Sequence, residues 1–135
     1  MIHPRVVGKW MYMRTKLLLI DDEVVTLKTT KMLLDQHGYD VEISLTTSEA
    51  ISVLTTTPID LILLDISMPT IDGFDFIKLM SSLRIHVPVI FLSNTDDPYT
   101  VKMAEAEGVK RCVKKNAEFM YLPQIIEEIL ADKRA

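Results

Sequence analysis

Five short segments typical of strands, separated by amphipathic ones, dominate the hydrophobicity pattern of this chain. The strongest covers residues 59–65, where four consecutive apolar residues run up to Asp65 and a turn with Pro69 and Gly73 follows. A strand that is apolar on both faces belongs in the middle of a parallel sheet covered by helices. The other expected strands are the apolar segments 16–20 and 87–92, the alternating segment 39–45 near an edge of the sheet, and the more polar segment 109–114, an expected edge strand.

Helices are expected in the segments between these strands. The spacing of Thr46 and Glu49 is that of a capping box and predicts a helix through Leu54. The other helices are expected at residues 23–36, from 72 to about 83, from 96 to 107 and from 122 to 130. Strands that alternate with helices in this way predict an α/β fold, a doubly wound five-stranded parallel sheet with helices on both faces.

The chain is long enough for one domain with a single core. We assign residues 16–132 to this domain and residues 1–15 to an N-terminal extension. The extension is expected to be flexible, as chain termini usually are. The alternative is a flap that packs on the domain or on a second copy through Trp10 and Tyr12.

Composition excludes several functional classes. A net charge of −4 argues against direct nucleic-acid binding, and no apolar run reaches the length of a membrane helix. Cys112 is the single cysteine, so an internal disulfide is impossible, which fits a reducing compartment. The composition therefore predicts a soluble cytoplasmic domain that does not associate with a membrane.

Polar residues follow four of the five predicted strands. They are Asp21-Asp22, Asp65, Ser93 and Lys115. The carboxyl ends of parallel strands share one edge of a sheet, where ligands of open α/β sheets bind. Carboxylates crowded there repel one another unless a cation lies between them, and Mg²⁺ prefers such oxygen ligands. Taken alone, the Asp pair could be a helix cap and Ser93 a turn residue. Their coincidence instead predicts a phosphoryl site with Asp65 as the nucleophile.

Four stretches of the chain resemble the receiver domain of two-component response regulators. They are residues 19–23 (LIDDE), 63–73 (LLDISMPTIDG), 88–93 (PVIFLS) and 113–115 (VKK). Their order and spacing make the resemblance specific over residues 16–130. It implies a flavodoxin-like sheet of strand order 2-1-3-4-5.

The resemblance also implies a role for each matching residue. Asp65 resembles the phosphoacceptor, and Ser93 and Lys115 resemble the switch hydroxyl and the phosphate-pairing lysine. The Mg²⁺ ligands that the resemblance implies are Asp21, Asp22, Asp65 and the Ser67 main-chain carbonyl. Such domains take a phosphoryl group from a phosphohistidine of a sensor histidine kinase or a histidine phosphotransfer protein. They catalyse only this transfer and their own dephosphorylation, and they control a downstream protein or a fused output domain.

Two positions depart from the family pattern. Asn116 stands where a proline usually follows the lysine, so we expect a trans bond and a different loop. Cys112 stands where the family usually has an aromatic residue that couples the site to the output face. That face, residues 98–130 here, is also a candidate homodimer surface.

Two other enzyme classes fit the sequence less well. A P-loop enzyme would need a Gly-rich segment before a Lys-Ser or Lys-Thr pair, and a haloacid-type phosphatase would need an Asp where Ser67 stands. The alternative that remains is a receiver fold that binds a protein partner without phosphorylation.

Overall fold

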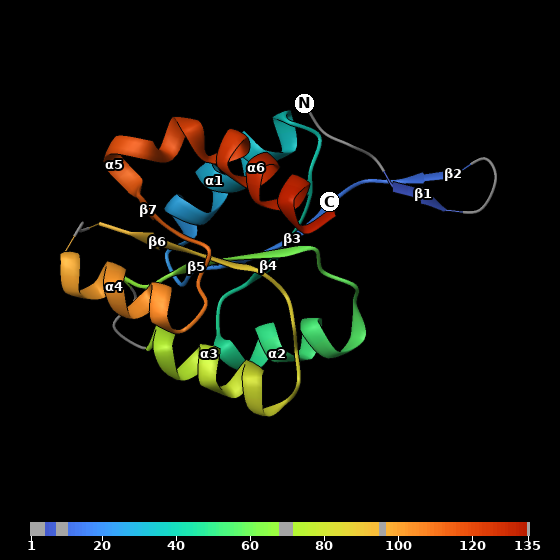
Figure 1. Cartoon of the computed structure of the whole chain (residues 1–135). Helices are drawn as coiled ribbons and strands as arrows, with labels where there is room; N and C mark the ends of the chain where they lie inside the picture. The colour runs from blue at the N-terminus through green and yellow to red at the C-terminus, as the bar shows by residue number, and fades with distance from the viewer. Residues whose placement is uncertain (1–4, 8–10, 68–71, 95–96, 135) are drawn as a thin grey trace.

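The parallel sheet lies at the centre of the molecule. The computed structural model describes residues 5–7, 11–67, 72–94 and 97–134. The sheet strands are β3 (Lys16–Ile20), β4 (Asp40–Ser44), β5 (Leu61–Asp65), β6 (Val89–Ser93) and β7 (Arg111–Lys114). All four pairings are parallel and the strand order is β4-β3-β5-β6-β7 (Figure 1). The predicted doubly wound sheet of order 2-1-3-4-5 is therefore confirmed.

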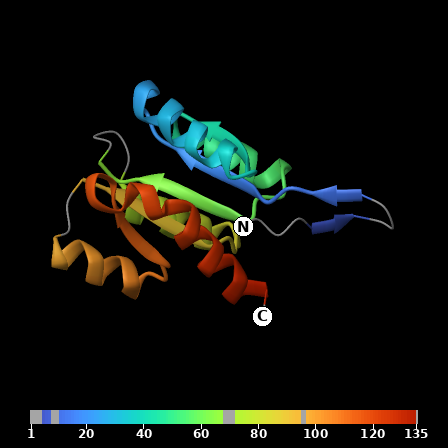
Figure 2. The same cartoon turned by 90° about the horizontal axis from the view of Figure 1, so that it is seen from above.

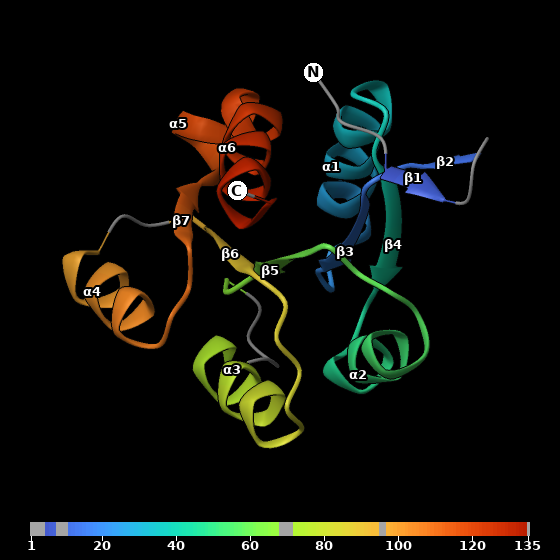
Figure 3. The same cartoon turned by 45° about the vertical axis from the view of Figure 1, so that its right-hand side comes forward.

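Helices cover both faces of this sheet. They are α1 (Val24–Gln36), α2 (Thr47–Thr56), α3 (Gly73–Ser82), α4 (Pro98–Ala106), α5 (Lys115–Glu118), the 3-10 helix η1 (Phe119–Tyr121) and α6 (Leu122–Arg134). The helices α1 and α6 lie on one face, and α2, α3 and α4 lie on the other (Figure 3). The pattern predicted five of these helices, but it missed α5 and η1.

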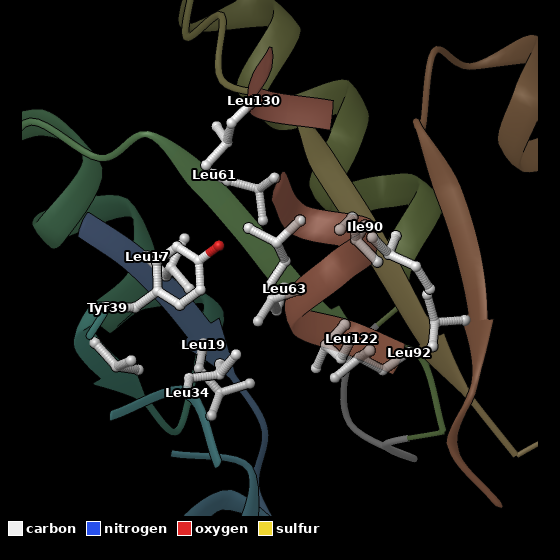
Figure 4. Close-up of a cluster of buried hydrophobic side chains, with 14 of the residues drawn as sticks. Leu17, Leu19, Leu34, Tyr39, Leu61, Leu63, Ile90, Leu92, Leu122 and Leu130 are labelled. Atoms are coloured by element: carbon white, nitrogen blue, oxygen red, sulfur yellow. The ribbon is translucent and has the colours of Figure 1, made fainter. Parts of the chain in front are cut away.

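The side chains of the sheet alternate between two apolar clusters, one on each face. Leu17, Leu19, Leu61 and Leu63 pack with α1 and α6 (Figure 4). The residues between them, including Leu18, Ile62 and Leu64, pack with α2 and α3. Both faces of β3, β5 and β6 are thereby removed from water, as the apolar runs in these segments predicted.

Local signals set the ends of two helices in the expected way. The Glu49 backbone N–H donates to the Thr46 hydroxyl over 3.1 Å, and the Leu45 N–H donates to the Glu49 carboxylate over 2.9 Å. The predicted capping interaction at α2 is therefore present. Helix α1 ends at Gln36 with His37 as its C-cap, and Gly38 follows with φ of 82°, a conformation that glycine adopts without strain.

A short hairpin precedes the sheet. Strands β1 (Arg5–Val7) and β2 (Met11–Met13) pair antiparallel, with Val6 opposite Tyr12. The hairpin projects away from the sheet, beyond the start of β3 (Figures 1 and 2). The apolar run around Met11 was too short to predict it. Trp10 lies outside the described residues, so the flexibility or packing of this extension stays a prediction.

Candidate functional site

Four strand ends come together at one edge of the sheet, on the side opposite the hairpin. Ile20 lies beside Leu64 in the register of β3 and β5, so Asp21 follows next to Asp65. Ser93 ends β6 and pairs with Lys114, the residue before Lys115. Three of the predicted site residues are almost fully buried: Asp21, Asp65 and Ser93 are 1%, 3% and 3% exposed.

A short ion pair joins two of these residues. The Lys115 ammonium contacts the Asp65 carboxylate directly, and it lies 4.0 Å from Asp21 Oδ2. The second Asp65 oxygen, Oδ1, accepts a hydrogen bond of 2.8 Å from the Ser67 backbone N–H. The ammonium therefore offsets part of the cost of burying two carboxylates side by side.

Asp21 is the less satisfied of the two carboxylates. Its Oδ1 accepts a 2.9 Å hydrogen bond from the Glu23 backbone N–H, whereas its buried Oδ2 has no hydrogen-bond partner among the described residues. Burial raises the pKa of Asp21 from 3.8 to about 6, and the neighbouring Asp65 charge adds to that rise. An unpartnered buried oxygen beside a second carboxylate is a suitable place for a cation.

Ser67 connects two of the strand ends. Its hydroxyl accepts a 3.2 Å hydrogen bond from the Asn94 backbone N–H, so the turn after β5 contacts the segment that follows β6. Ser67 itself is exposed. Residues 68–71 and 95–96, which complete the two motifs, lie outside the described residues.

Asp22 differs from its neighbour, because it is exposed. In the part of the chain that the structure describes, no three His, Cys, Asp or Glu side chains gather closely enough to hold a metal ion. The carboxylates that do come together are those of Asp21 and Asp65, near the turn that carries Ser67. A ligand role for Asp22 stays a prediction.

The sequence did not anticipate the segment that follows β7. The chain enters α5 at Lys115 itself, and the described residues contain no cis peptide bond, as expected for Asn116. Glu118 accepts a 3.1 Å hydrogen bond from the Lys114 backbone N–H. The only sequence signal for this contact is a carboxylate four residues after the end of the strand.

Comparison with known proteins agrees with this geometry. The family model of the response regulator receiver domain matches residues 17–127. The chain belongs to the response regulator receiver family. It is 33% identical over 101 residues to the response regulator SaeR of Staphylococcus aureus. These matched residues make up 75% of this chain and 44% of SaeR. The chain therefore spans less than half the length of this curated relative.

Solved receiver structures have the same fold. The receiver domain of the Francisella response regulator 1452 superposes with a TM-score of 0.79 at 26% identity, over 90% of this chain and all of that one. A CheY-like receiver protein of Methanospirillum hungatei gives a TM-score of 0.79 at 24% identity, over 89% of this chain and 96% of that one. The chain is thus a receiver domain, a signalling module, with the flavodoxin-like fold.

None of the helices within the described residues has both the length and the apolar content that a membrane span requires.

Proposed function

We propose that this receiver accepts a phosphoryl group on Asp65 from the phosphohistidine of a sensor histidine kinase or a histidine phosphotransfer protein. The observation that carries the proposal is the burial of Asp65 at the end of the central strand, in contact with Lys115 and beside Asp21. Two buried carboxylates side by side are costly even with a lysine between them, which favours a chemical role for this site.

The transfer is a substitution at phosphorus. An Asp65 carboxylate oxygen forms the new P–O bond while the P–N bond to the donor histidine breaks. The electron pair of that bond leaves with the imidazole nitrogen, which then takes up a proton. Later attack by water on phosphorus releases inorganic phosphate and restores the carboxylate. The domain therefore catalyses only its own loading and unloading, with its own Asp65 as the phosphoryl acceptor.

Mg²⁺ is the cofactor that the donor set fits. The buried Asp21 Oδ2 without a hydrogen-bond partner and the Asp65 carboxylate supply anionic oxygens, and the Ser67 carbonyl and Asp22 would complete the protein ligands. The ion, when bound, neutralises charge on the phosphoryl oxygens. Ionised Asp21 would hold the ion. Burial is the main cause of the raised pKa of Asp21 and the Asp65 charge adds to it, so a bound cation would favour the ionised form.

Ser93 and Lys115 would recognise the phosphoryl group once it is on Asp65. Lys115 pairs with Asp65 in the unloaded protein and can pair with a phosphoryl oxygen in the loaded one. Ser93 is buried at the end of the neighbouring strand, where its hydroxyl can donate to another phosphoryl oxygen. A change of partner at these two residues is what would distinguish the two states.

The partners follow from this chemistry. We propose a cytoplasmic domain that meets a kinase or phosphotransfer protein and then controls a downstream protein or a fused output domain. The face of residues 98–130, formed by α4, β7, α5, η1 and α6, is the proposed output or homodimer surface. Direct nucleic-acid binding by this segment is not expected, given its net negative charge.

A labelling experiment tests the proposal. The wild type and Asp65→Asn are incubated with radiolabelled acetyl phosphate or a phosphorylated kinase domain, with Mg²⁺ or with EDTA. Label should appear only on the wild type with Mg²⁺, and it should be acid-stable and alkali-labile, as an acyl phosphate is. Equal labelling of both proteins, or labelling unaffected by EDTA, would refute it. Asp22→Ala should raise the Mg²⁺ concentration needed for half-maximal labelling.

The same experiment addresses the alternative of a binding module that works without phosphorylation. If neither donor labels the wild type at any Mg²⁺ concentration, that alternative is favoured. The intact set of Asp65, Ser93 and Lys115 argues against it.

A further inference from the structure

The local sequence contains few features that would fix the backbone conformation of the turn that carries Lys115. Helix α5 has four residues, far fewer than an isolated helix needs to be stable. Asn116 follows Lys115, so no proline ring restricts the backbone there. Within the described residues, β7 pairs only with β6 and lies at the edge of the sheet. The position of the Lys115 ammonium therefore depends on contacts from other side chains.

Glu118 makes two such contacts. Its Oε1 accepts the hydrogen bond from the backbone N–H of Lys114, the N-cap residue of α5. Its Oε2 lies 3.8 Å from Nη2 of Arg111, the first residue of β7. One carboxylate thus links the beginning and the end of β7 to the last residue of α5. The Lys114 side chain makes no cap hydrogen bond of its own to α5.

The two contacts differ in strength. The Arg111 and Glu118 side chains are 43% and 38% exposed, and an ion pair of this kind contributes little. The hydrogen bond to Lys114 is partly buried and has an ionised acceptor, which makes it stronger than a neutral one. It also fixes the backbone immediately before Lys115. The oxygen acceptor of Glu118, rather than its attraction to Arg111, should therefore hold the turn.

We propose that Glu118 is a positioning residue, which holds the turn between β7 and α5 so that the Lys115 ammonium reaches Asp65. Glu118 acts through Lys115 and not on the phosphoryl group. The effect on phosphoryl binding rests on the function proposed above, whereas the effect on the position of Lys115 does not.

The first test observes Lys115 directly, in the metal-free protein without phosphate. The side-chain ¹⁵Nζ and ¹³Cε resonances of Lys115 are assigned by their loss in Lys115→Ala. Glu118→Ala should shift both towards the values of solvent-exposed lysines. Glu118→Gln, which keeps an oxygen acceptor, and Arg111→Ala, which removes only the ion pair, should leave them near the wild type.

Two results would overturn the proposal at this stage. One is an unshifted Lys115 resonance in Glu118→Ala; the other is a shift in Arg111→Ala as large as that in Glu118→Ala. If Glu118→Ala does not fold, Glu118→Asp takes its place, because its shorter side chain should produce a smaller shift in the same direction.

The second test measures the affinity for beryllofluoride with Mg²⁺, by fluorescence or calorimetry. Glu118→Ala should bind about tenfold more weakly than the wild type, the effect expected for loss of a capping interaction. In a Lys115→Ala background the same change should weaken binding by less than about twofold, because its effect passes through Lys115. Additive losses would contradict a positioning role. A wild type that does not bind beryllofluoride would instead refute the proposed function, and the resonance test would still decide the role of Glu118.

Discussion

The Lys115 ammonium contacts the Asp65 carboxylate across the end of β6, so a residue that follows an edge strand is joined to the end of the central strand. Asp21 Oδ2 lies 4.0 Å from the same ammonium. One cation therefore serves two buried carboxylates. A phosphoryl group on Asp65 would compete with the two carboxylates for this lysine. A change of partner at Lys115 would therefore affect the conformation of β7, the strand that precedes it.

Lys115→Ala is expected to separate phosphorylation from conformational change. Asp65 remains available as an acceptor, so labelling by acetyl phosphate should continue, more slowly. The contact that distinguishes the loaded from the unloaded state is lost, so beryllofluoride should shift few amide resonances in α4 and β7. A backbone amide spectrum with and without beryllofluoride and Mg²⁺ measures this. Shifts as extensive as those of the wild type would show that the lysine does not transmit the change.

Asp21 should make the metal-free protein less stable as the pH rises. Its pKa is about 6 in the folded protein, against 3.8 for an unperturbed aspartate, so the folded state binds this proton more tightly. The stability that this provides is complete below about pH 4 and is lost as the pH rises through about 6, a decrease of about 3 kcal/mol at most. Urea unfolding in EDTA at pH 5 and pH 7.5 measures it.

Asp21→Asn is the matched control for that titration, because its amide cannot ionise. At pH 7.5 without metal it should be more stable than the wild type, and its stability should fall less between the two pH values. Mg²⁺ should stabilise the wild type more than the variant, since it binds the ionised form. Identical pH dependence in the two proteins would mean that the ionisation of buried Asp21 does not control stability.

Gly73 allows α3 to begin against the sheet. A Cβ there would lie 2.7 Å from Ile66 Cγ2 and 3.2 Å from Phe91 Cζ. Gly73→Ala should therefore destabilise the protein by about 1–3 kcal/mol through overpacking, despite the better helix propensity of alanine. Ser81→Ala, at an exposed position of the same helix, is the control and should change stability by less than about 0.5 kcal/mol. Chemical unfolding compares the two; equal effects would exclude a packing role for Gly73.

Much of the fold and of the site follows from the sequence. The apolar runs located β3, β5 and β6, because residues that are buried on both faces of a sheet form continuous apolar segments. The edge strands β4 and β7 were located from more polar segments, and they are partly exposed. Asp21 and Asp65 could be placed together once the sheet was known to be parallel. The strand order could be predicted only from the resemblance to receiver domains, because the apolar pattern of residues 16–20 does not indicate which strands lie on either side of this one.

Other features depend on tertiary contacts that no local pattern reveals. The run around Met11 has three described residues in its strand, too few to establish a period, and its pairing with β1 came only from the structure. Asp22 follows Asp21 directly, yet one is exposed and the other buried, because the side chains diverge where the strand ends. Glu118 was missed because its main partner is a backbone N–H, which carries no side-chain signal.

Ser93, rather than Cys112, should couple the site to the face of residues 98–130. Cys112 lies beside Phe91 in the sheet and packs, half-buried, on the cluster that contains Ala104 of α4. Its side chain is small and has one rotatable bond to sulfur, so rotating it moves almost no surface. Ser93 ends β6 immediately before the segment that leads to α4, so movement of its hydroxyl towards a phosphoryl oxygen would draw that segment with it.

Two alanine variants distinguish these routes. Cys112→Ala should change the beryllofluoride-induced response of α4 and β7 by less than about twofold, as expected where little packing is lost. Ser93→Ala should remove most of that response, because the loaded state loses the contact through which it would be favoured. Amide chemical shifts, or partner affinity with and without beryllofluoride, provide the measurement. A response that persists in Ser93→Ala but disappears in Cys112→Ala would show that Cys112, and not Ser93, couples the site to this face. The thiol would then transmit the signal, and the movement would have to pass from Phe91 through β7 to the helices that cover it.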